Sequence, residues 1–433
     1  MKHSSIIDRT GSTLGVMDDL QIAVHSYDGC ARGCPGCIVD KHFKNHARFE
    51  PILKGDDLQL INRRVLEYSD WVQKTLNYKE GGYFGRNGYQ VQHHSYTFRF
   101  GNHAELPVDE LIALGGMLHT DYRVFSVAPP TNEEIEKFAT MKSILGGSVF
   151  LEIIYDPFAD SPEAIRDAVL AMRENGLNGY PELLLTKRLI RDYPAERFLD
   201  ECVSIFGDIG AQIQFGRYSP SRTRNFNKTQ MATVDEEAEW LAVLAKGIVA
   251  RGHDIHPIPL GEYAVTLLDE YREIEAVGED GYVDPARLRE PDPFLVKSVR
   301  EKTRDIFLTS LYIDHNLDVF VWSESMGQHV LDSNFGYPPL GNLRQNSIID
   351  MATENGGALD RMLNEVIREL LTNRKCAPCR YKSFCASHAV PLFRRFHKDD
   401  GEHCYGYLPV IREYQRDLSF LNNMVEGFRE LGF

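Results

Sequence analysis

The cysteines are the residues in this chain whose type and spacing point most directly to chemistry. Eight are present, and seven of them fall into two groups. The first group is Cys30, Cys34 and Cys37, and the second is Cys376, Cys379, Cys385 and Cys404. Close groups of cysteines in a chain without an export signal indicate metal binding rather than disulfides. The sequence therefore predicts two metal sites.

The first group lies in one short loop, from Asp28 to Cys37, with the spacing C-x3-C-x2-C. Three glycines and a proline in this loop disfavour helix and strand and allow the backbone to curl around one centre. Soft thiolate ligands favour an iron–sulfur cluster, zinc or copper(I). A structural zinc normally takes four protein ligands. Three cysteines without a local fourth therefore favour a [4Fe–4S] cluster with one open iron, and a disulfide or a zinc loop is the alternative.

This loop follows an apolar stretch, 21–27, that is expected to form the first strand. A C-x3-C-x2-C loop after the first strand resembles the signature of the radical S-adenosylmethionine (SAM) superfamily. In that superfamily the open iron binds the amino and carboxylate groups of SAM, so the resemblance implies SAM as a cofactor. Gly36 stands before the third cysteine, where the superfamily usually has an aromatic residue. This departure concerns the packing around SAM rather than the three ligands.

The resemblance also implies the reaction. An electron reduces the cluster, SAM is cleaved to methionine and a 5′-deoxyadenosyl radical, and that radical takes a hydrogen atom from the substrate. The protein would then be an oxidoreductase that needs an electron donor such as flavodoxin or ferredoxin. Because the cofactors carry the difficult step, an acid–base triad is not required.

The second group has the spacing C-x2-C-x5-C, with Cys404 farther along the chain. Four thiolates close a metal site completely. The group and the stretch before it resemble a SPASM domain over roughly residues 309–410. The shared features before the cysteines are a hairpin with Asp314 and Asn316 at its turn, followed by Leu340-Gly341-Asn342.

A full SPASM domain carries cysteines for a further cluster, and this chain departs from that pattern. Ala389 stands where one of those additional cysteines is expected. The resemblance therefore implies one auxiliary [4Fe–4S] cluster, held by Cys376, Cys379, Cys385 and Cys404. A zinc knuckle at the same four thiolates is the alternative.

The charge and hydropathy of the chain narrow its partners and location. The formal net charge of −15 at pH 7 argues against nucleic acid or an anionic membrane as the main partner. No apolar run looks like a signal peptide, and no stretch approaches the ~18 apolar residues of a membrane span. We therefore expect a cytoplasmic protein.

Short apolar runs alternate with helical patterns through the first half of the chain. Strands are expected over 21–27, 95–100, 122–128, 148–155, 182–186 and 211–216. Between them, Thr131-x-x-Glu134 and Ser161-Pro162 each predict the start of a helix. Strands joined by helices imply an α/β fold with a parallel sheet and right-handed crossovers. The resemblance implies that this sheet is the partial (β/α)6 barrel of radical SAM proteins.

Three regions are expected along the chain. They are a radical SAM barrel over 1–216, a bridging helical region over 217–305, and a small SPASM/twitch-like auxiliary-cluster domain over 306–433. Outside the barrel strands, periodicity predicts helices over 57–76, 357–373 and 406–424 and a hairpin over 309–322. Within the bridge, Thr233-x-x-Glu236 predicts a helix that ends at Gly252.

The resemblance also suggests which residues hold SAM besides the cluster. The candidates are Gly101, Asn102 and Glu105 for the amino group, Glu152 or Asp156 for the ribose, and Arg217 for the carboxylate. The strand-end positions agree with the crevice at the carboxyl ends of the strands, where open α/β sheets bind ligands. An ordinary Gly-Asn turn and a turn before Pro157 are the alternative interpretations of the first two sets.

Cys202 is the one cysteine outside both groups, and it lies in a predicted helix. A thiol at such a position could donate a hydrogen atom to a substrate radical, as in radical epimerases. A buried core cysteine is the simpler interpretation and the one the sequence favours.

Three functions remain open from the sequence. The first is a radical SAM maturase that cross-links, oxidises, epimerises or forms a thioether in a peptide or protein, with a separate leader-peptide-binding protein as a partner. The second is the same chemistry on a small molecule such as an aminocyclitol or a sugar. The third is a zinc-binding interaction module without catalytic activity.

Overall fold

A computed structural model gives the fold of the chain. It describes residues 20–24, 27–28, 50–51, 53, 55–77, 94–98, 107–109, 112, 121–126, 128–145, 149–217, 228–252, 255–258, 260–273, 276–287, 310–323, 329–331, 338–353, 358–379, 404 and 408–430.

Most of the described strands join one sheet, in the order β12-β11-β10-β1-β4-β5-β6-β7-β8-β9. Their bounds are β1 (Leu20–Val24), β4 (His94–Phe98), β5 (Asp121–Ser126), β6 (Val149–Ile154), β7 (Asn178–Leu185), β8 (Ala211–Arg217), β9 (Ile255–Ile258), β10 (Ser310–Ile313), β11 (Asp318–Ser323) and β12 (His329–Leu331). Neighbours from β10 through β9 pair in parallel, whereas β11 and β12 are antiparallel. The predicted α/β class with a parallel sheet is confirmed.

Short strands complete the pairing. β13 (Gly341–Asn342) pairs with β11, and β2 (Tyr27–Asp28) pairs with β3 (Glu50–Pro51) in a separate ribbon. The strands expected over 21–27, 95–100, 122–128, 148–155, 182–186 and 211–216 correspond to β1, β4, β5, β6, β7 and β8 in turn.

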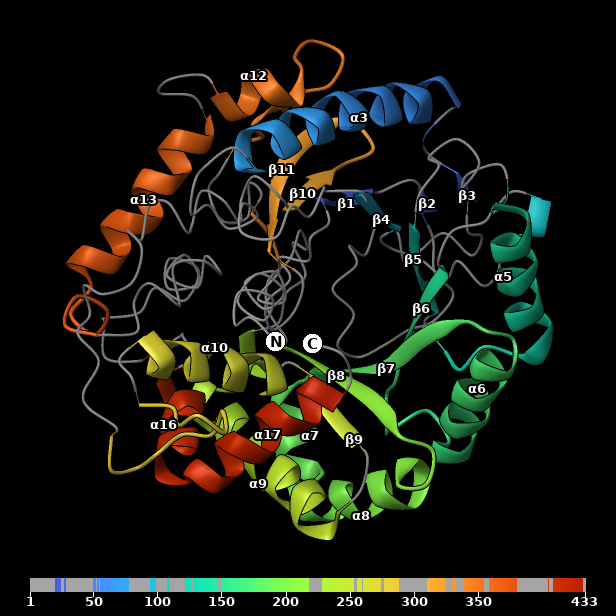
Figure 1. Ribbon diagram of the computed structural model, residues 1–433. Coiled ribbons are helices and arrows are strands. Elements are labelled where there is room, and N and C mark those ends of the chain that lie inside the picture. Colours follow the sequence, from blue (N-terminus) through green and yellow to red (C-terminus); the bar gives the residue numbers. More distant parts are fainter. Residues whose placement is uncertain are drawn as a thin grey trace.

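The sheet curves, and the crossover helices lie outside the curve. In Figure 1 it runs from β11 at the top, past β5 and β6, to β9 at the bottom. The helices on its convex side include α5 (Asn132–Leu145), α6 (Pro162–Glu174), α8 (Ala195–Phe206) and α9 (Val234–Arg251). The short helix α7 (Lys187–Asp192) precedes α8 in the chain. One side of the sheet is thus covered by helices, and the other is concave.

Local sequence explains where these helices start. The Ser161 hydroxyl accepts a hydrogen bond from the backbone N–H of Ala164 at 3.4 Å, and Pro162 occupies the first turn of α6. Thr233 and Glu236 form a reciprocal capping box at the start of α9, with bonds of 2.7 and 3.2 Å. Gly252 ends α9 with a φ of 67°, which favours glycine. These predicted helix ends are confirmed.

The core of the barrel region is aromatic and lies between the convex side of the sheet and the helices. Phe198 of α8 packs on Phe215 of β8 and Trp240 of α9, with ring centroids 6.4 and 5.4 Å away. Strand residues alternate between faces, so Ala211, Ile213 and Phe215 of β8 face the helices. The even-numbered residues of β8 face the concave side.

The C-terminal part of the chain extends the same sheet. β10 pairs in parallel with β1 and turns into β11, so the predicted hairpin over 309–322 is confirmed. The predicted helices over 57–76 and 357–373 appear as α3 (Gly55–Asn77) and α13 (Ala358–Thr372). The short helix α12 (Ile348–Thr353) packs on α3. The hairpin region is therefore joined to the barrel through hydrogen-bonded strands and a helix contact.

Two features differ from the expectations. Strand β9 lies within 217–305, where only helices were expected, and it extends the sheet beyond β8. The single helix expected over 406–424 is two helices, α16 (Leu408–Arg416) and α17 (Leu418–Glu430), which pack with α10 (Leu260–Glu273). The boundaries of the three expected domains remain a prediction.

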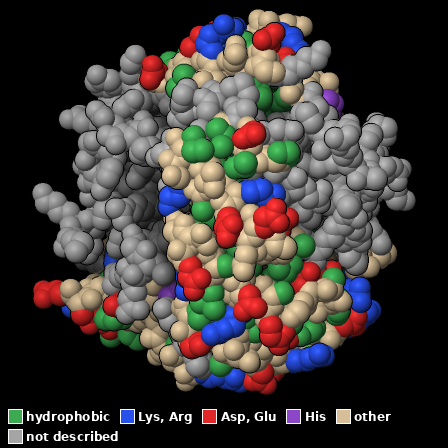
Figure 2. Space-filling model, turned by 90° about the vertical axis from the view of Figure 1, so that its right-hand side faces the viewer, with side chains coloured by type: hydrophobic (Ala, Val, Ile, Leu, Met, Phe, Trp, Pro, Cys, Tyr) green, Lys and Arg blue, Asp and Glu red, His purple; other side chains and the backbone are tan. Residues whose placement is uncertain are grey.

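The outer surface on the α5 and α6 side is mixed in charge. Figure 2 shows basic and acidic side chains interspersed on the described part of this face, with hydrophobic groups between them. Such a surface is ordinary for a solvent-facing helical layer. Within the part of the chain that the structure describes, no helix combines the length and apolar character needed to cross a membrane.

Candidate active site and metal-binding turn

The predicted site residues follow strands whose carboxyl ends meet at one edge of the sheet. Val24, the end of β1, lies opposite Phe98, the end of β4, in register. The segments that carry the first cysteines and the Gly101 stretch therefore begin at the same edge, where α/β sheets bind ligands. The site residues of these segments lie outside the described residues: Cys30, Cys34, Cys37, Gly101, Asn102 and Glu105.

Two buried carboxylates lie on the concave side of the sheet. Glu152 of β6 is fully buried, and Glu182 of β7 is 4% exposed. In register, Glu152 lies opposite Tyr180, and Glu182 lies opposite Gln214 of β8. Because strand residues alternate between faces, all four side chains share the face opposite to the crossover helices. Polar groups therefore gather inside the curve of the sheet, where a ligand with hydroxyl or charged groups can be held.

Asp156 follows β6 and makes its contacts within its own turn. Its Oδ1 accepts a hydrogen bond from the backbone N–H of Phe158 at 3.0 Å, and its own N–H donates to Asp160 Oδ2 at 2.8 Å. This is the turn role that the sequence left as an alternative. Arg217 is the last residue of β8 and lies opposite Leu185 in register.

Cys202 lies in the helical layer rather than on the concave side. It is 1% exposed on α8, one turn after Phe198, whose ring packs on Phe215. Burial raises the pKa of the Cys202 thiol well above its usual value of 9.0, and the Glu201 carboxylate adds to this effect. Its position supports the interpretation of Cys202 as a core residue.

The second cysteine group begins in a turn directly after α13. Cys376 and Cys379 are both half-buried there, and the N–H of Cys379 donates to the carbonyl of Cys376 at 2.9 Å. Cys404 is also half-buried, whereas Cys385 lies outside the described residues. Among the described residues, no three His, Cys, Asp or Glu side chains form a group that could hold a metal ion. Cys376 and Cys379 thus share one turn, and Cys404 does not join them in a group of three in the described part of the chain.

The donor chemistry of this turn fits the predicted group. Two thiols in a C-x2-C turn are a donor pair that soft metals and iron–sulfur clusters take. Asn373, at the start of the turn, is 4% exposed and accepts from the backbone N–H groups of Lys375 and Cys376 at 2.7 and 3.2 Å. The pair thus sits on a backbone that hydrogen bonds already fix.

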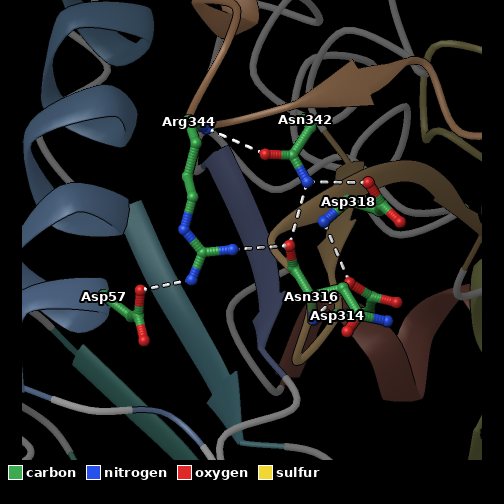
Figure 3. A network of polar contacts seen from close by, with 6 residues as sticks. All are labelled: Asp57, Asp314, Asn316, Asp318, Asn342 and Arg344. Atoms are coloured by element: carbon green, nitrogen blue, oxygen red, sulfur yellow. Dashed lines mark hydrogen bonds and ion pairs between the residues drawn. The ribbon is translucent and has the colours of Figure 1, made fainter.

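A polar network joins the hairpin turn to β13 and to α3 (Figure 3). Asp314 Oδ1 accepts from the N–H groups of Asn316 and Asp318 at 2.8 and 2.9 Å. The Asn342 side-chain amide donates to the Asn316 carbonyl and to Asp318 Oδ1 at 2.9 and 2.8 Å. This explains why Asp314, Asn316 and the Leu340-Gly341-Asn342 stretch occur together in the sequence.

Arg344 extends this network to the first crossover helix. Its guanidinium forms an ion pair with Asp57, near the start of α3, at 2.7 Å. The same side chain donates to the Asn316 carbonyl at 3.3 Å. Arg344 thus links the hairpin turn to α3, a helix that lies far earlier in the sequence.

Sequence reasoning missed Glu182 and Asn373. Glu182 occurs in an apolar strand, and a carboxylate within such a run was the available signal. Asn373 stands three residues before Cys376, where an Asx turn could have been expected.

No known family profile matches the sequence, and no curated protein matches it well enough to count as a relative. Solved structures do match the fold. anSMEcpe with bound AdoMet (SAM) has a TM-score of 0.57 and 12% identity, covering 94% of this chain and 99% of that chain. anSMEcpe with AdoMet and the Cp18Cys peptide has a TM-score of 0.55 at 12% identity, with the same coverage. SuiB of Streptococcus suis bound to precursor peptide SuiA has a TM-score of 0.50 and 12% identity, covering 92% of this chain and 77% of that chain.

Both proteins are radical SAM proteins, and anSMEcpe has a SPASM domain. At this level of identity the likeness shows the fold. The chain therefore shares the α/β fold of these two proteins over most of its length, which agrees with the resemblance in its cysteine pattern.

Proposed function

We propose that this chain is a radical SAM enzyme that modifies a peptide or protein substrate. One observation carries the proposal: a C-x3-C-x2-C segment follows β1, the first strand of a sheet with the radical SAM fold. The fold alone hosts no single function, and the three cysteines alone fit several metals. Their combination at this one strand end supports a SAM-binding cluster.

The residues of the chain have distinct roles in this proposal. When bound, the cluster and SAM supply the radical that abstracts a hydrogen atom from the substrate. Cys30, Cys34 and Cys37 are the cluster ligands, and Gly101, Asn102 and Glu105 follow the neighbouring strand, where the SAM amino group is held.

Glu152 is the ribose contact, since it is buried on the concave side while Asp156 is engaged in its own turn. Arg217, at the end of β8, is the contact for the SAM carboxylate.

A second cluster is assigned to the C-terminal cysteines. Cys376, Cys379, Cys385 and Cys404 hold one auxiliary [4Fe–4S] cluster in this proposal. The half-buried C-x2-C pair after α13 supports the assignment. Reduction of the clusters requires an external one-electron donor such as flavodoxin or ferredoxin.

A peptide substrate is supported by the solved structures with the same fold. The anSMEcpe structure holds the Cp18Cys peptide beside AdoMet, and the SuiB structure holds the precursor peptide SuiA. We infer that the concave side of this chain likewise faces a peptide, with the side chain to be modified near the strand ends.

The test is SAM cleavage by protein purified without oxygen. Wild type is expected to be brown, to hold about eight irons per chain if both clusters are [4Fe–4S], and to form 5′-deoxyadenosine after reduction. Cys34→Ala is expected to abolish 5′-deoxyadenosine, measured by chromatography and mass spectrometry. Cys202→Ala is the matched control, because it removes a thiol from the helical core and is expected to leave cleavage intact. Colourless wild-type protein that holds zinc, or a Cys34→Ala variant that still forms the nucleoside, would refute the proposal.

A further inference from the structure

Asn373 is a buried polar residue at the C-terminal end of α13, where side chains are usually exposed to solvent. It follows the last residue of α13 and is 4% exposed, whereas the preceding residue, Thr372, is exposed. A helix end usually satisfies its last carbonyls with water or a glycine turn. A buried asparagine at this point indicates a specific role for its side chain.

Asn373 makes hydrogen bonds with the first cysteine of the turn and with the residues on either side of it, Lys375 and Ala377. Its Oδ1 accepts from the N–H of Lys375 at 2.7 Å and from the N–H of Cys376 at 3.2 Å. Its backbone carbonyl accepts from the N–H of Ala377 at 2.8 Å. Three consecutive N–H groups of the turn therefore point at one asparagine.

This arrangement fixes the backbone that carries the two thiols. The N–H of Cys376 is held by Asn373, and the carbonyl of Cys376 accepts from the N–H of Cys379 at 2.9 Å. The backbone that leads into the C-x2-C pair and joins its two cysteines is thereby held by hydrogen bonds of the turn itself. Ligand groups held in advance lose little freedom on binding, which raises the affinity of a metal site.

We propose that Asn373 is the positioning residue for Cys376 and Cys379 as ligands of the auxiliary cluster. The side-chain oxygen orients the turn without touching the metal. The inference depends on the proposed function in one respect, namely that the second cysteine group holds an iron–sulfur cluster.

The test compares iron content and cluster spectra of full-length variants purified without oxygen. Asn373→Ala removes the acceptor for two N–H groups and is expected to lower iron from about eight to about four per chain. Cleavage of SAM without substrate is expected to persist, because the first cluster is untouched. Asn373→Asp keeps an acceptor of the same shape and is expected to retain the iron. Its added negative charge is expected to shift the reduction potential of the auxiliary cluster to lower values.

Thr372→Ala is the matched control. Thr372 ends α13 beside Asn373, but its hydroxyl donates to the carbonyl of Arg368 at 2.8 Å, inside the helix. It is expected to keep full iron and an unchanged potential, which separates cysteine positioning from general support of the helix end.

Asn373→Ala with full iron and an unchanged spectrum would overturn the inference. If circular dichroism shows that the alanine variant does not fold, Asn373→Leu decides, because leucine has a similar size but no acceptor, and full iron in that variant would also overturn the inference. A wild-type protein with zinc in place of the second cluster would refute the auxiliary cluster, not the positioning role. Zinc content then replaces iron in the same comparison.

Discussion

At the scale of single residues, the most informative position is Glu152. Removing a carboxylate from water costs several kcal/mol unless polar partners replace the water. Glu152 is fully buried in the middle of β6, on the concave side of the sheet. In the proposed function this buried carboxylate is the contact for the SAM ribose.

Glu152→Gln is therefore expected to weaken SAM binding. A hydrogen bond to a charged group contributes about 1.5–3 kcal/mol, which corresponds to roughly ten- to hundredfold in the dissociation constant. The measurement is anaerobic equilibrium dialysis with labelled SAM. Asp156→Asn is the matched control, since its carboxylate serves the local turn, and it is expected to change the dissociation constant less than Glu152→Gln. An unchanged dissociation constant in Glu152→Gln would remove this residue from the SAM site.

The candidate site residues that could be predicted from the sequence are those that occur at a characteristic spacing along the chain. Seven cysteines could be assigned to two sites because their separation along the chain carries the chemistry. The role of Asn373 depends on which N–H groups its side chain meets in three dimensions, and spacing does not show this. The polar surroundings of Glu182 were missed for the same reason. Its position beside Gln214 follows from the register of β7 and β8, which the sequence does not show.

At the scale of helices and strands, the predictions held where an element was long and flanked by clear signals. Strands β1 and β4 to β8 overlap their predicted ranges because each is a compact apolar run, although β1 ends at Val24 and β7 begins at Asn178. β9 was missed because it has only four residues, and these include His256 and Pro257, which weaken the strand pattern.

The break between α16 and α17 was also missed, although a signal was present. Asp417 lies between the helices, and its Oδ1 accepts from the N–H of Phe420 at 3.1 Å, as an N-cap does. An aspartate three residues before an apolar residue also occurs inside helices, so Asp417 did not mark a break in the sequence. The apolar periodicity continues across it and predicted a single helix.

The hairpin network offers a test at this scale. Asn342→Ala removes two donated hydrogen bonds that join β13 to the hairpin turn and is expected to lower the free energy of unfolding by about 1–3 kcal/mol. Arg344→Ala breaks the ion pair with Asp57, but the Arg344 side chain is 53% exposed, so a loss of up to about 1 kcal/mol is expected. Thermal unfolding at equal cluster loading measures both. A larger loss in Arg344→Ala would show that the link to α3 outweighs the hairpin turn.

At the scale of the whole molecule, the main feature is that the C-terminal region and the barrel share one sheet. β1 pairs with β4 on one side and with β10 on the other, so a strand of the last third of the chain borders the first strand. Ile22 and Val24 of β1 and Ile313 of β10 are fully buried. The C-terminal strand β10 therefore supports β1, the strand that precedes the first cysteine segment in the chain.

Removal of residues 306–433 is accordingly expected to damage the barrel. The truncated chain would expose the β1 edge, and an exposed edge strand pairs with other chains. We expect aggregation and loss of the first cluster, measured by size-exclusion chromatography and iron content against the full-length protein. A monodisperse truncated chain with about four irons would show that the barrel folds independently.

The pairing of β1 with β10 has a consequence for synthesis in the cell. The ribosome makes β1 early, and β10 follows only after nearly three hundred further residues. At 5–20 residues per second, the β1 edge waits roughly 15–60 s for its neighbour. During that interval the nascent chain presents an unpaired edge of β1, so chaperone binding and the timing of cluster insertion would govern the yield of active protein.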